Sequence, residues 1–212
     1  MQRNVANTVI GLVAFMALLL GLLVNRVLSP VVMTNEQLSE NGMFVYEVPR
    51  SIQDFSLRDH NGQPFTKNNL AGKWSLIFFG YTYCPDICPI TLATIRQFEE
   101  LIKTAEEDAV IQVVMVTVDP QRDTPEKLGA YVKYFGEDYL GVTGEYIDIF
   151  NLARQVNIAF GYQPAEDGNY LVSHSGEIVV VNPNGDFHGF FKVPHDPEKM
   201  VRNFRSVFST WH

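Results

Sequence analysis

Two cysteines are the residues of this sequence best suited to chemistry, and they lie close together. Cys84 and Cys88 are the only cysteines of the chain, spaced Cys-x-x-x-Cys, and a proline follows each of them. Four residues make about one turn of a helix, so the two thiols can share one helical face. Such a pair can form a structural disulfide, act as a redox dithiol, or bind a metal ion through its thiolates.

Each of these alternatives carries its own expectation. A stabilising disulfide suits an oxidising compartment, but a bridge over so short a loop removes little chain entropy. A dithiol oxidoreductase normally uses Cys-x-x-Cys, and the additional residue here weakens that match. Two thiolates alone leave a metal under-coordinated, so the metal hypothesis needs another ligand. A thiol peroxidase is the weakest alternative, because the two cysteines lie close together in the sequence and neither has the usual context of a peroxidase cysteine.

The five histidines are the candidates for that ligand. His174 lies among small residues just ahead of an apolar run, so its loop could approach another site, although a lone loop histidine is the plain alternative. The other four have ordinary structural explanations: a turn for His60, a capping loop before a helix for His195, the solvated face of a strand for His188, and the carboxyl terminus for His212.

The elements around the cysteines predict where the site lies. A continuous apolar run over residues 74–82 indicates a strand buried on both faces. Apolar residues at helical spacing follow the motif, at Ile90, Ile95, Phe98 and Ile102, and predict a helix that opens there. A thiol at a helix N-terminus lies in a positive local field, which lowers its pKa. The motif therefore lies at the carboxyl end of the buried strand, and ligands of open α/β sheets commonly bind at that edge.

The remaining segments alternate between strands and helices. Thr124 fits an N-cap with Pro125 at the first helical position. An alternation of this kind, followed by an antiparallel pair, predicts an α/β domain with a mixed central sheet flanked by helices. The predicted elements are a hairpin over 54–66, a buried strand over 109–119, helices over 123–135, 146–162 and 196–208, and two strands over 177–191.

The N-terminal segment predicts a membrane anchor. Residues 4–25 contain no charged side chain, and the run from Val5 to Val24 would span about 30 Å as a helix. The run is longer than a signal-peptide core and no A-x-A-like site follows it, so we expect it to stay uncleaved. We divide the chain into an anchor (1–26), a tether (27–45) and a globular domain (46–212).

The distribution of charge predicts the side of the membrane on which the domain lies. Arg3 and the amino terminus lie on one side of the anchor and Arg26 lies on the other, and the next basic residue is Arg50. This slight bias puts the N-terminus inside and the domain outside. No long Arg/Ser-rich leader precedes the anchor, which favours a bacterial inner membrane with a periplasmic domain. All 24 acidic residues follow Arg26 and give the domain a net negative charge. This charge argues against a nucleic-acid partner.

Three segments together resemble the SCO/SenC family of copper-binding assembly factors. They are GYTYCPDICP (80–89), VTVDPQRDTPEKLGAYVKYF (116–135) and YLVSHS (170–175), whose histidine precedes a strand. The resemblance extends over about residues 50–208, together with the anchor. It implies a thioredoxin-like fold in which Cys84, Cys88 and His174 bind copper.

One position departs from the family pattern. Many members carry an acidic residue before the histidine, and here that residue is Ser173. Asp119 could take over an outer-shell role, although a strand-end residue that caps the next turn is the simpler interpretation. Two thiolates are soft ligands that hold Cu(I), and an imidazole lets the site also accept Cu(II).

The resemblance also implies a role, which is copper delivery to the CuA site of cytochrome c oxidase subunit II, or reduction of its thiols. We therefore expect a membrane-anchored copper chaperone. The alternative is an enzyme, a periplasmic thiol–disulfide oxidoreductase that uses Cys84 and Cys88 as a redox-active dithiol. His174 discriminates between the two hypotheses, because a metal carrier needs it and dithiol exchange does not.

Overall fold

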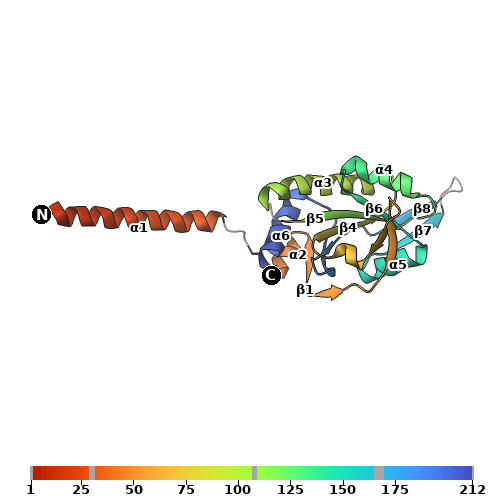
Figure 1. The fold of residues 1–212 in the computed structure, drawn as a ribbon, viewed down its shortest axis with the longest axis horizontal. Coiled ribbons are helices and arrows are strands. Elements are labelled where there is room, and N and C mark those ends of the chain that lie inside the picture. The colour runs from red at the N-terminus through yellow and green to blue at the C-terminus, as the bar shows by residue number, and fades with distance from the viewer. Residues whose placement is uncertain (1, 29–31, 107–108, 165–169, 212) are drawn as a thin grey trace.

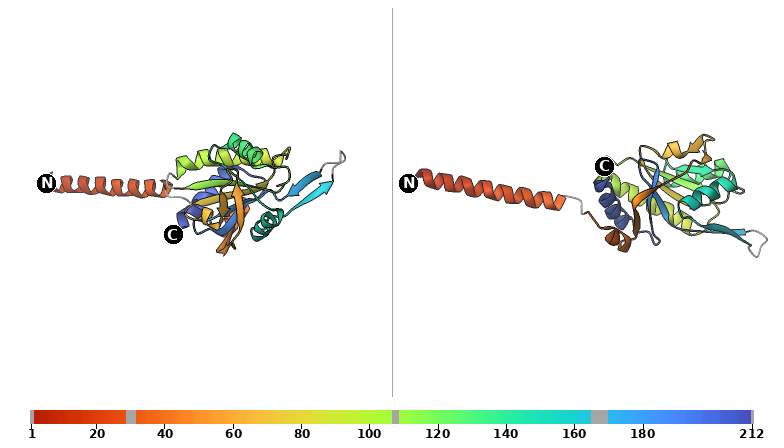
Figure 2. Two further views of the ribbon diagram at one scale, coloured as in Figure 1. Left: turned by 45° about the vertical axis from the view of Figure 1, so that its right-hand side comes forward. Right: turned by 90° about the horizontal axis from the view of Figure 1, so that it is seen from below.

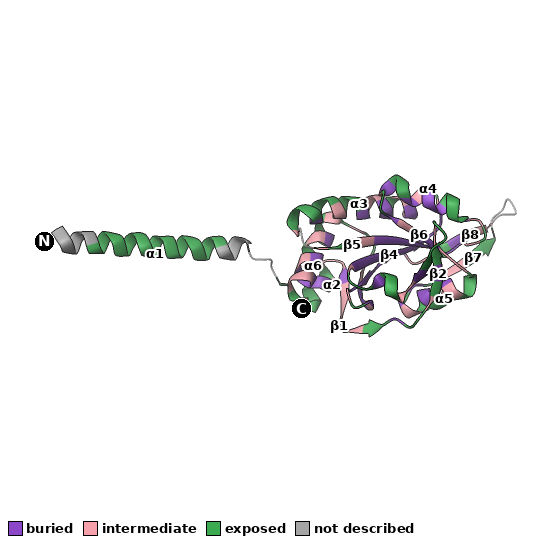
Figure 3. Cartoon of the chain, viewed as in Figure 1, coloured by how far each residue is buried: buried purple, intermediate pink, exposed green. Residues whose placement is uncertain are grey.

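The computed structural model describes residues 2–28, 32–106, 109–164 and 170–211. Figures 1 and 2 show a long N-terminal helix, α1 (Gln2–Leu28), followed by an α/β domain. Among the described residues, α1 is the one helix long and apolar enough to cross a membrane, through Asn7–Val24. The side chains of this span are exposed (Figure 3), as they would be in an anchor or a signal sequence.

The domain is built on a mixed sheet, as the sequence predicts. Its strands lie in the order β1-β10-β9-β4-β5-β6-β2-β3, with parallel pairing between β4, β5 and β6 and antiparallel pairing elsewhere. The strands are β1 (Met43–Ser51), β2 (Ser56–Asp59), β3 (Pro64–Thr66), β4 (Trp74–Gly80), β5 (Ile111–Thr117), β6 (Leu140–Thr143), β9 (Ile178–Val181) and β10 (Asp186–Phe191).

Helices cover both faces of this sheet. Figure 1 shows α3 (Ile87–Ala105) and α4 (Pro125–Phe135) above it and α5 (Tyr146–Gln155) below it. α6 (Pro197–Thr210) packs against α3, and a short 3₁₀ helix spans Lys67–Leu70. Every residue of β4 is buried, which fits the continuous apolar run that predicts it (Figure 3).

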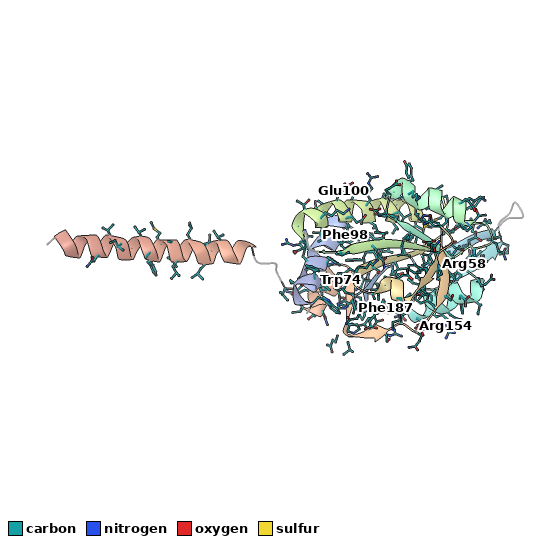
Figure 4. All side chains as sticks on the ribbon, in the orientation of Figure 1. Arg58, Trp74, Phe98, Glu100, Arg154 and Phe187 are labelled. Carbon is teal, nitrogen blue, oxygen red and sulfur yellow. The ribbon has the colours of Figure 1, made fainter. Side chains whose placement is uncertain are left out.

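The core joins the sheet to the helices above it. Trp74 of β4, Phe98 of α3 and Phe187 of β10 are buried and lie in the body of the domain (Figure 4). Phe98 packs edge-on against Phe204 of α6, with ring centroids 5.7 Å apart. This packing holds the second half of α3, the helix that follows the cysteine motif, against α6.

Several predicted elements are confirmed. The hairpin over 54–66 forms as β2 and β3, and Gly62 takes a positive φ of 78° in its turn, a conformation that suits glycine. The hydroxyl of Thr124 accepts a hydrogen bond from the Lys127 N–H and caps α4, which begins at Pro125. The last two strands of the large sheet, β9 and β10, pair as predicted.

The helix predicted over 146–162 is wrong in its second half. α5 ends at Gln155, and Asn157 takes a positive φ of 60°, which an α-helix does not allow. The chain then forms β7 (Phe160–Pro164), which pairs with β8 (Tyr170–His174) in a separate two-stranded sheet. Neither this hairpin nor β6 was predicted.

Part of the range expected to be a tether is folded. Within residues 27–45 lie α2 (Asn35–Glu40) and the start of β1. Leu38 and Met43 are 3% and 0% exposed and belong to the hydrophobic core. Residues 29–31 of that range, and His212 at the other end of the chain, lie outside the described residues.

Candidate metal centre

The cysteine loop connects the carboxyl end of β4 to the start of α3. The N–H of Cys84 donates to the carbonyl of Tyr81 (3.2 Å), which folds the loop back on itself. The N–H of Cys88, in the first turn of α3, points at the Cys84 Sγ, 3.4 Å away. A Cβ atom at Gly80 would lie 2.9 Å from the Cys88 Sγ, so glycine there leaves the room that this thiol occupies.

The two cysteines, both free thiols, differ in exposure and in acidity. Cys84 is half-buried, whereas Cys88 is completely buried. Hydrogen bonding from the Cys88 thiol, aided by nearby backbone N–H groups, lowers the pKa of Cys84 to about 4. The neighbouring Cys84 sulfur and burial together raise the pKa of Cys88. Cys84 is therefore the accessible thiolate, and Cys88 is the protonated partner that stabilises it.

His174 approaches the cysteines from the end of β8. Its Nε2 lies 3.4 Å from the Cys88 Sγ, and its Nδ1 lies 2.9 Å from the backbone carbonyl of Ser175. Because a carbonyl can only accept, Nδ1 carries the proton and Nε2 presents its lone pair to the sulfurs. The rings of Phe78 and Tyr81 pack edge-on against the imidazole and hold its plane.

The structure thus brings together the three residues that the sequence proposed. One donor atom from each of Cys84, Cys88 and His174 lies within 4.8 Å of the others. Two soft sulfurs and one imidazole nitrogen form a donor set that suits copper. A structural zinc site would use four ligands, so an open set of three fits a metal that must leave again.

The segment 119–123 contacts both the loop that carries the cysteines and the strand that carries His174. The Asp123 carboxylate accepts hydrogen bonds from the Thr82 N–H, the Thr82 hydroxyl and the Thr117 hydroxyl, and so holds the cysteine loop. Burial raises the pKa of Asp123, and these hydrogen bonds oppose that shift. Arg122 donates to the Tyr170 carbonyl (3.1 Å) at the start of β8, the strand that ends in His174.

Asp119 is a structural residue. It is 0% exposed, accepts a hydrogen bond from the Tyr170 hydroxyl (2.7 Å), and pairs with the Nε of Arg122. Its backbone carbonyl accepts from the N–H groups of Arg122 and Asp123, which is the turn-capping role expected of it. Ser173 donates to the Gly161 carbonyl of the neighbouring strand (3.2 Å) and makes no contact with the donor set that the structure records.

The sequence did not single out Arg122, Asp123 or Tyr170 as positioning residues. Arg122 and Asp123 lie in VTVDPQRDTPEKLGAYVKYF and Tyr170 lies in YLVSHS, two segments that carry the family resemblance, but no pattern in the sequence gave these residues a role in positioning the site. Asp123 bonds to Thr82 and Arg122 bonds to Tyr170, and each pair is separated by about 40 to 50 residues in the chain. No local pattern specifies such pairings.

The other described histidines lie elsewhere. The Nδ1 of His60 accepts from the Gly141 N–H (3.1 Å), and the Nε2 of His195 lies 2.8 Å from the Gly176 carbonyl oxygen. The solvated position expected for His188 is wrong, because this residue is 9% exposed. The aromatic rings of Trp74 and Trp211 flank it edge-on, and the burial lowers the pKa of His188 to about 4.

A mixed sheet flanked by helices, with a dithiol and a histidine at one strand edge, defines a thioredoxin-like protein with a candidate metal centre. The chain belongs to the SCO1/SenC family, whose model matches residues 46–209, as the resemblance implied.

The chain is similar to proteins from bacteria, animals and plants. A protein of Stutzerimonas stutzeri, provisionally named as copper-binding, is 37% identical over 76% of this chain and 78% of its own length. The mitochondrial SCO2 homolog of Mus musculus is 35% identical over 75% of this chain and 63% of its own length. The crystal structure of Arabidopsis thaliana ScoI with copper bound has a TM-score of 0.71 at 32% identity, covering 75% of this chain and 98% of that one. The chain spans about half to two thirds of the length of several mitochondrial relatives.

Proposed function

We propose that this protein is a membrane-anchored copper chaperone that binds one copper ion through Cys84, Cys88 and His174. The convergence of these three donor atoms within 4.8 Å, beside the carboxyl end of β4, is the observation that carries the proposal. The copper-binding name of the Stutzerimonas relative and the copper-bound Arabidopsis structure support the choice of metal.

The donor set fits both oxidation states of copper. Two cysteine sulfurs suit Cu(I), and the His174 nitrogen allows the site to hold Cu(II) as well. Because Cys84 is half-buried and Cys88 is buried, a client would reach Cys84 first and exchange its own ligand for that sulfur. The client we propose is cytochrome c oxidase subunit II at its CuA site, or a similar copper protein.

The proposed location is a bacterial inner membrane, with a single pass through α1 and the domain in the periplasm. The uncharged span Asn7–Val24 supports the anchor, and the positive charges of the amino terminus and Arg3, against Arg26 alone just after the span, support the orientation. A reporter enzyme that is active only after export should be active when it is fused after His212, and a reporter that is active only in the cytoplasm should not. Activity of a cytoplasm-dependent reporter at that position would contradict this orientation.

A second function has its own supporting observation. The low pKa of Cys84 gives a reactive thiolate beside a second thiol, which is the chemistry of a thiol–disulfide oxidoreductase. In that case the dithiol would reduce cysteines of the oxidase subunit or of another client. His174 would then be dispensable, because thiol exchange needs no metal ligand.

The stoichiometry of copper binding tests the ligand set. The reduced full chain in detergent should bind one Cu(I), and Cys84→Ser or Cys88→Ser should abolish that binding, because a serine hydroxyl stays protonated at neutral pH. Ser173→Ala is the matched control, since Ser173 adjoins His174 but bonds to Gly161. Unchanged stoichiometry in either cysteine variant would remove that cysteine from the site.

Cells that carry His174→Ala separate the two functions. If copper carriage is the function, these cells should fail to assemble a CuA centre at limiting copper, although the dithiol still forms a disulfide on mild oxidation. Normal assembly of the centre in these cells would favour the oxidoreductase.

A further inference from the structure

A second histidine lies one step away from the donor set, on the segment that follows His174. The Nε2 of His195 lies 2.8 Å from the backbone carbonyl of Gly176. A carbonyl oxygen has no proton to give, so Nε2 is the donor of this hydrogen bond. His195 is largely shielded from solvent, and this burial lowers its pKa, which favours the neutral ring.

The Gly176 backbone is packed tightly at this point. A Cβ atom at Gly176 would lie 2.8 Å from the Val193 Cγ2 and 2.9 Å from the Ile87 Cδ1. Val193 belongs to the same loop as His195, and Ile87 directly precedes Cys88 in α3. The 193–195 loop and the cysteine helix therefore meet on the backbone two residues after His174.

The same segment fixes the imidazole of His174. Its Nδ1 donates to the Ser175 carbonyl, so two consecutive carbonyls each accept from a histidine. On the opposite side, the Ser175 N–H donates to the Ala159 carbonyl (2.9 Å), and the Ser175 hydroxyl accepts from the Ala159 N–H (3.2 Å). Residues 175–176 are thus held between the 157–160 turn on one side and His195 on the other.

We propose that His195 is a positioning residue of the metal centre, whose Nε2–H fixes the Gly176 carbonyl and thereby holds the His174 ring against the cysteines. This inference rests on the proposed function, because it matters to copper only if His174 is a ligand. His195 itself stays outside the donor set.

Removal of the donor has a predictable effect. A buried carbonyl without its partner shifts to find another hydrogen bond, and the Ser175 carbonyl that orients His174 shifts with it. Loss of such outer-shell support commonly weakens metal binding by about 10- to 100-fold. The affinity for Cu(II), which depends on the imidazole nitrogen, should decrease far more than the affinity for Cu(I), which the two sulfurs hold.

Two substitutions separate the hydrogen bond from the bulk of the side chain. His195→Leu fills the space without a donor, whereas the amide nitrogen of His195→Gln lies where Nε2 lies and can still donate. In the full chain in detergent, His195→Leu should bind Cu(II) about 10-fold more weakly, at the low end of that range, and change the thiolate charge-transfer band. His195→Gln should retain both properties. Unchanged Cu(II) binding in His195→Leu, or failure of glutamine to restore it, would overturn the inference.

A double-mutant cycle tests whether the effect passes through His174. In a His174→Ala background, His195→Leu should have no further effect on Cu(I) affinity. If His195→Leu lowers Cu(I) affinity by the same factor with and without His174, His195 is a general stability residue and the inference is overturned. If His174→Ala alone leaves Cu(II) binding intact, the ligand set is wrong, and both the proposed function and this inference fail.

The wild-type chain allows a direct test of the hydrogen bond itself. In ¹⁵N-labelled histidine spectra of the metal-free full chain, His195 should be neutral at pH 7 with its proton on Nε2. The His195→Gln spectrum identifies its signals. A proton on Nδ1 would contradict the hydrogen bond to Gly176 and overturn the inference.

Discussion

The Asp123 carboxylate holds Thr82 twice, by accepting from its backbone N–H at 3.1 Å and from its hydroxyl at 2.6 Å. Thr82 lies two residues before Cys84, and Asp123 lies one residue before the cap of α4. The cysteine loop is therefore tied to the segment that also contacts Tyr170, at the start of the strand that carries His174. One short segment sets the separation between the thiols and the imidazole.

We predict that Asp123→Ala lowers the free energy of unfolding by about 3 kcal/mol, because it leaves buried hydrogen-bond donors of Thr82 and Thr117 without partners. Asp196→Ala is the matched control: it removes an exposed carboxylate that caps α6 through the Lys199 N–H, and it should cost about 1 kcal/mol. Denaturant unfolding of the metal-free chains at pH 7 measures both. Equal losses in the two variants would show that the bonds to Thr82 add nothing beyond an ordinary cap.

The pKa of Cys84 predicts an unusual alkylation profile. A thiol with a pKa of about 4 is fully ionised at pH 6, so the rate of its reaction with iodoacetamide should be nearly flat from pH 6 to 8. An ordinary thiol, with a pKa of about 8.5, would react about tenfold faster for each pH unit over most of that range. Mass spectrometry of the metal-free protein should find the label on Cys84 before Cys88.

A variant tests the cause of that acidity. The hydrogen bond from the Cys88 thiol is the largest contribution to the low pKa of Cys84. Cys88→Ala should therefore raise this pKa and restore a rate that increases with pH. A steep profile in the wild-type chain, or an unchanged flat profile in Cys88→Ala, would contradict this description of the dithiol.

The burial of His188 predicts a dependence of stability on pH. Its pKa is about 4 in the folded state and about 6.5 in an unfolded chain, so the unfolded state takes up the proton first as the pH falls. The stabilisation is complete above about pH 6.5 and is lost as the pH falls to about 4, by about 3 kcal/mol in total.

His188→Phe keeps a ring beside Trp74 and Trp211 and removes the titration. The unfolding free energy of this variant should fall less steeply than that of the wild-type chain between pH 6.5 and pH 4. Parallel curves for the two proteins would show that His188 titrates alike in the folded and unfolded states.

The sequence predicted the elements whose signals are local. The apolar run of β4 is buried at every position, and the Thr124–Pro125 cap begins α4 where it was expected. The convergence of Cys84, Cys88 and His174 was also predicted, although His174 was chosen through the family resemblance, because its spacing to the cysteines carries no geometric information.

Predictions failed where tertiary packing, and not the local sequence, determines burial or the end of an element. Ile90 fits the helical spacing of Ile95, Phe98 and Ile102, yet it is 60% exposed, because the buried face of α3 begins with Cys88 and continues through Leu92. Asn157 ends α5 through a backbone conformation that no neighbouring pattern announces. The burial of His188 depends on Trp74 and Trp211, which are distant in sequence.

The most direct test of the proposed copper centre is Cu(II) binding by His174→Ala in the full chain, compared with the wild type and with His60→Gln. His60 is the matched control because it bonds to the Gly141 N–H, away from the cysteines. We predict that His174→Ala loses Cu(II) binding and its thiolate charge-transfer absorption but still binds Cu(I) more weakly through Cys84 and Cys88, whereas His60→Gln behaves as the wild type. Retention of the wild-type Cu(II) spectrum and affinity by His174→Ala would contradict the proposed centre.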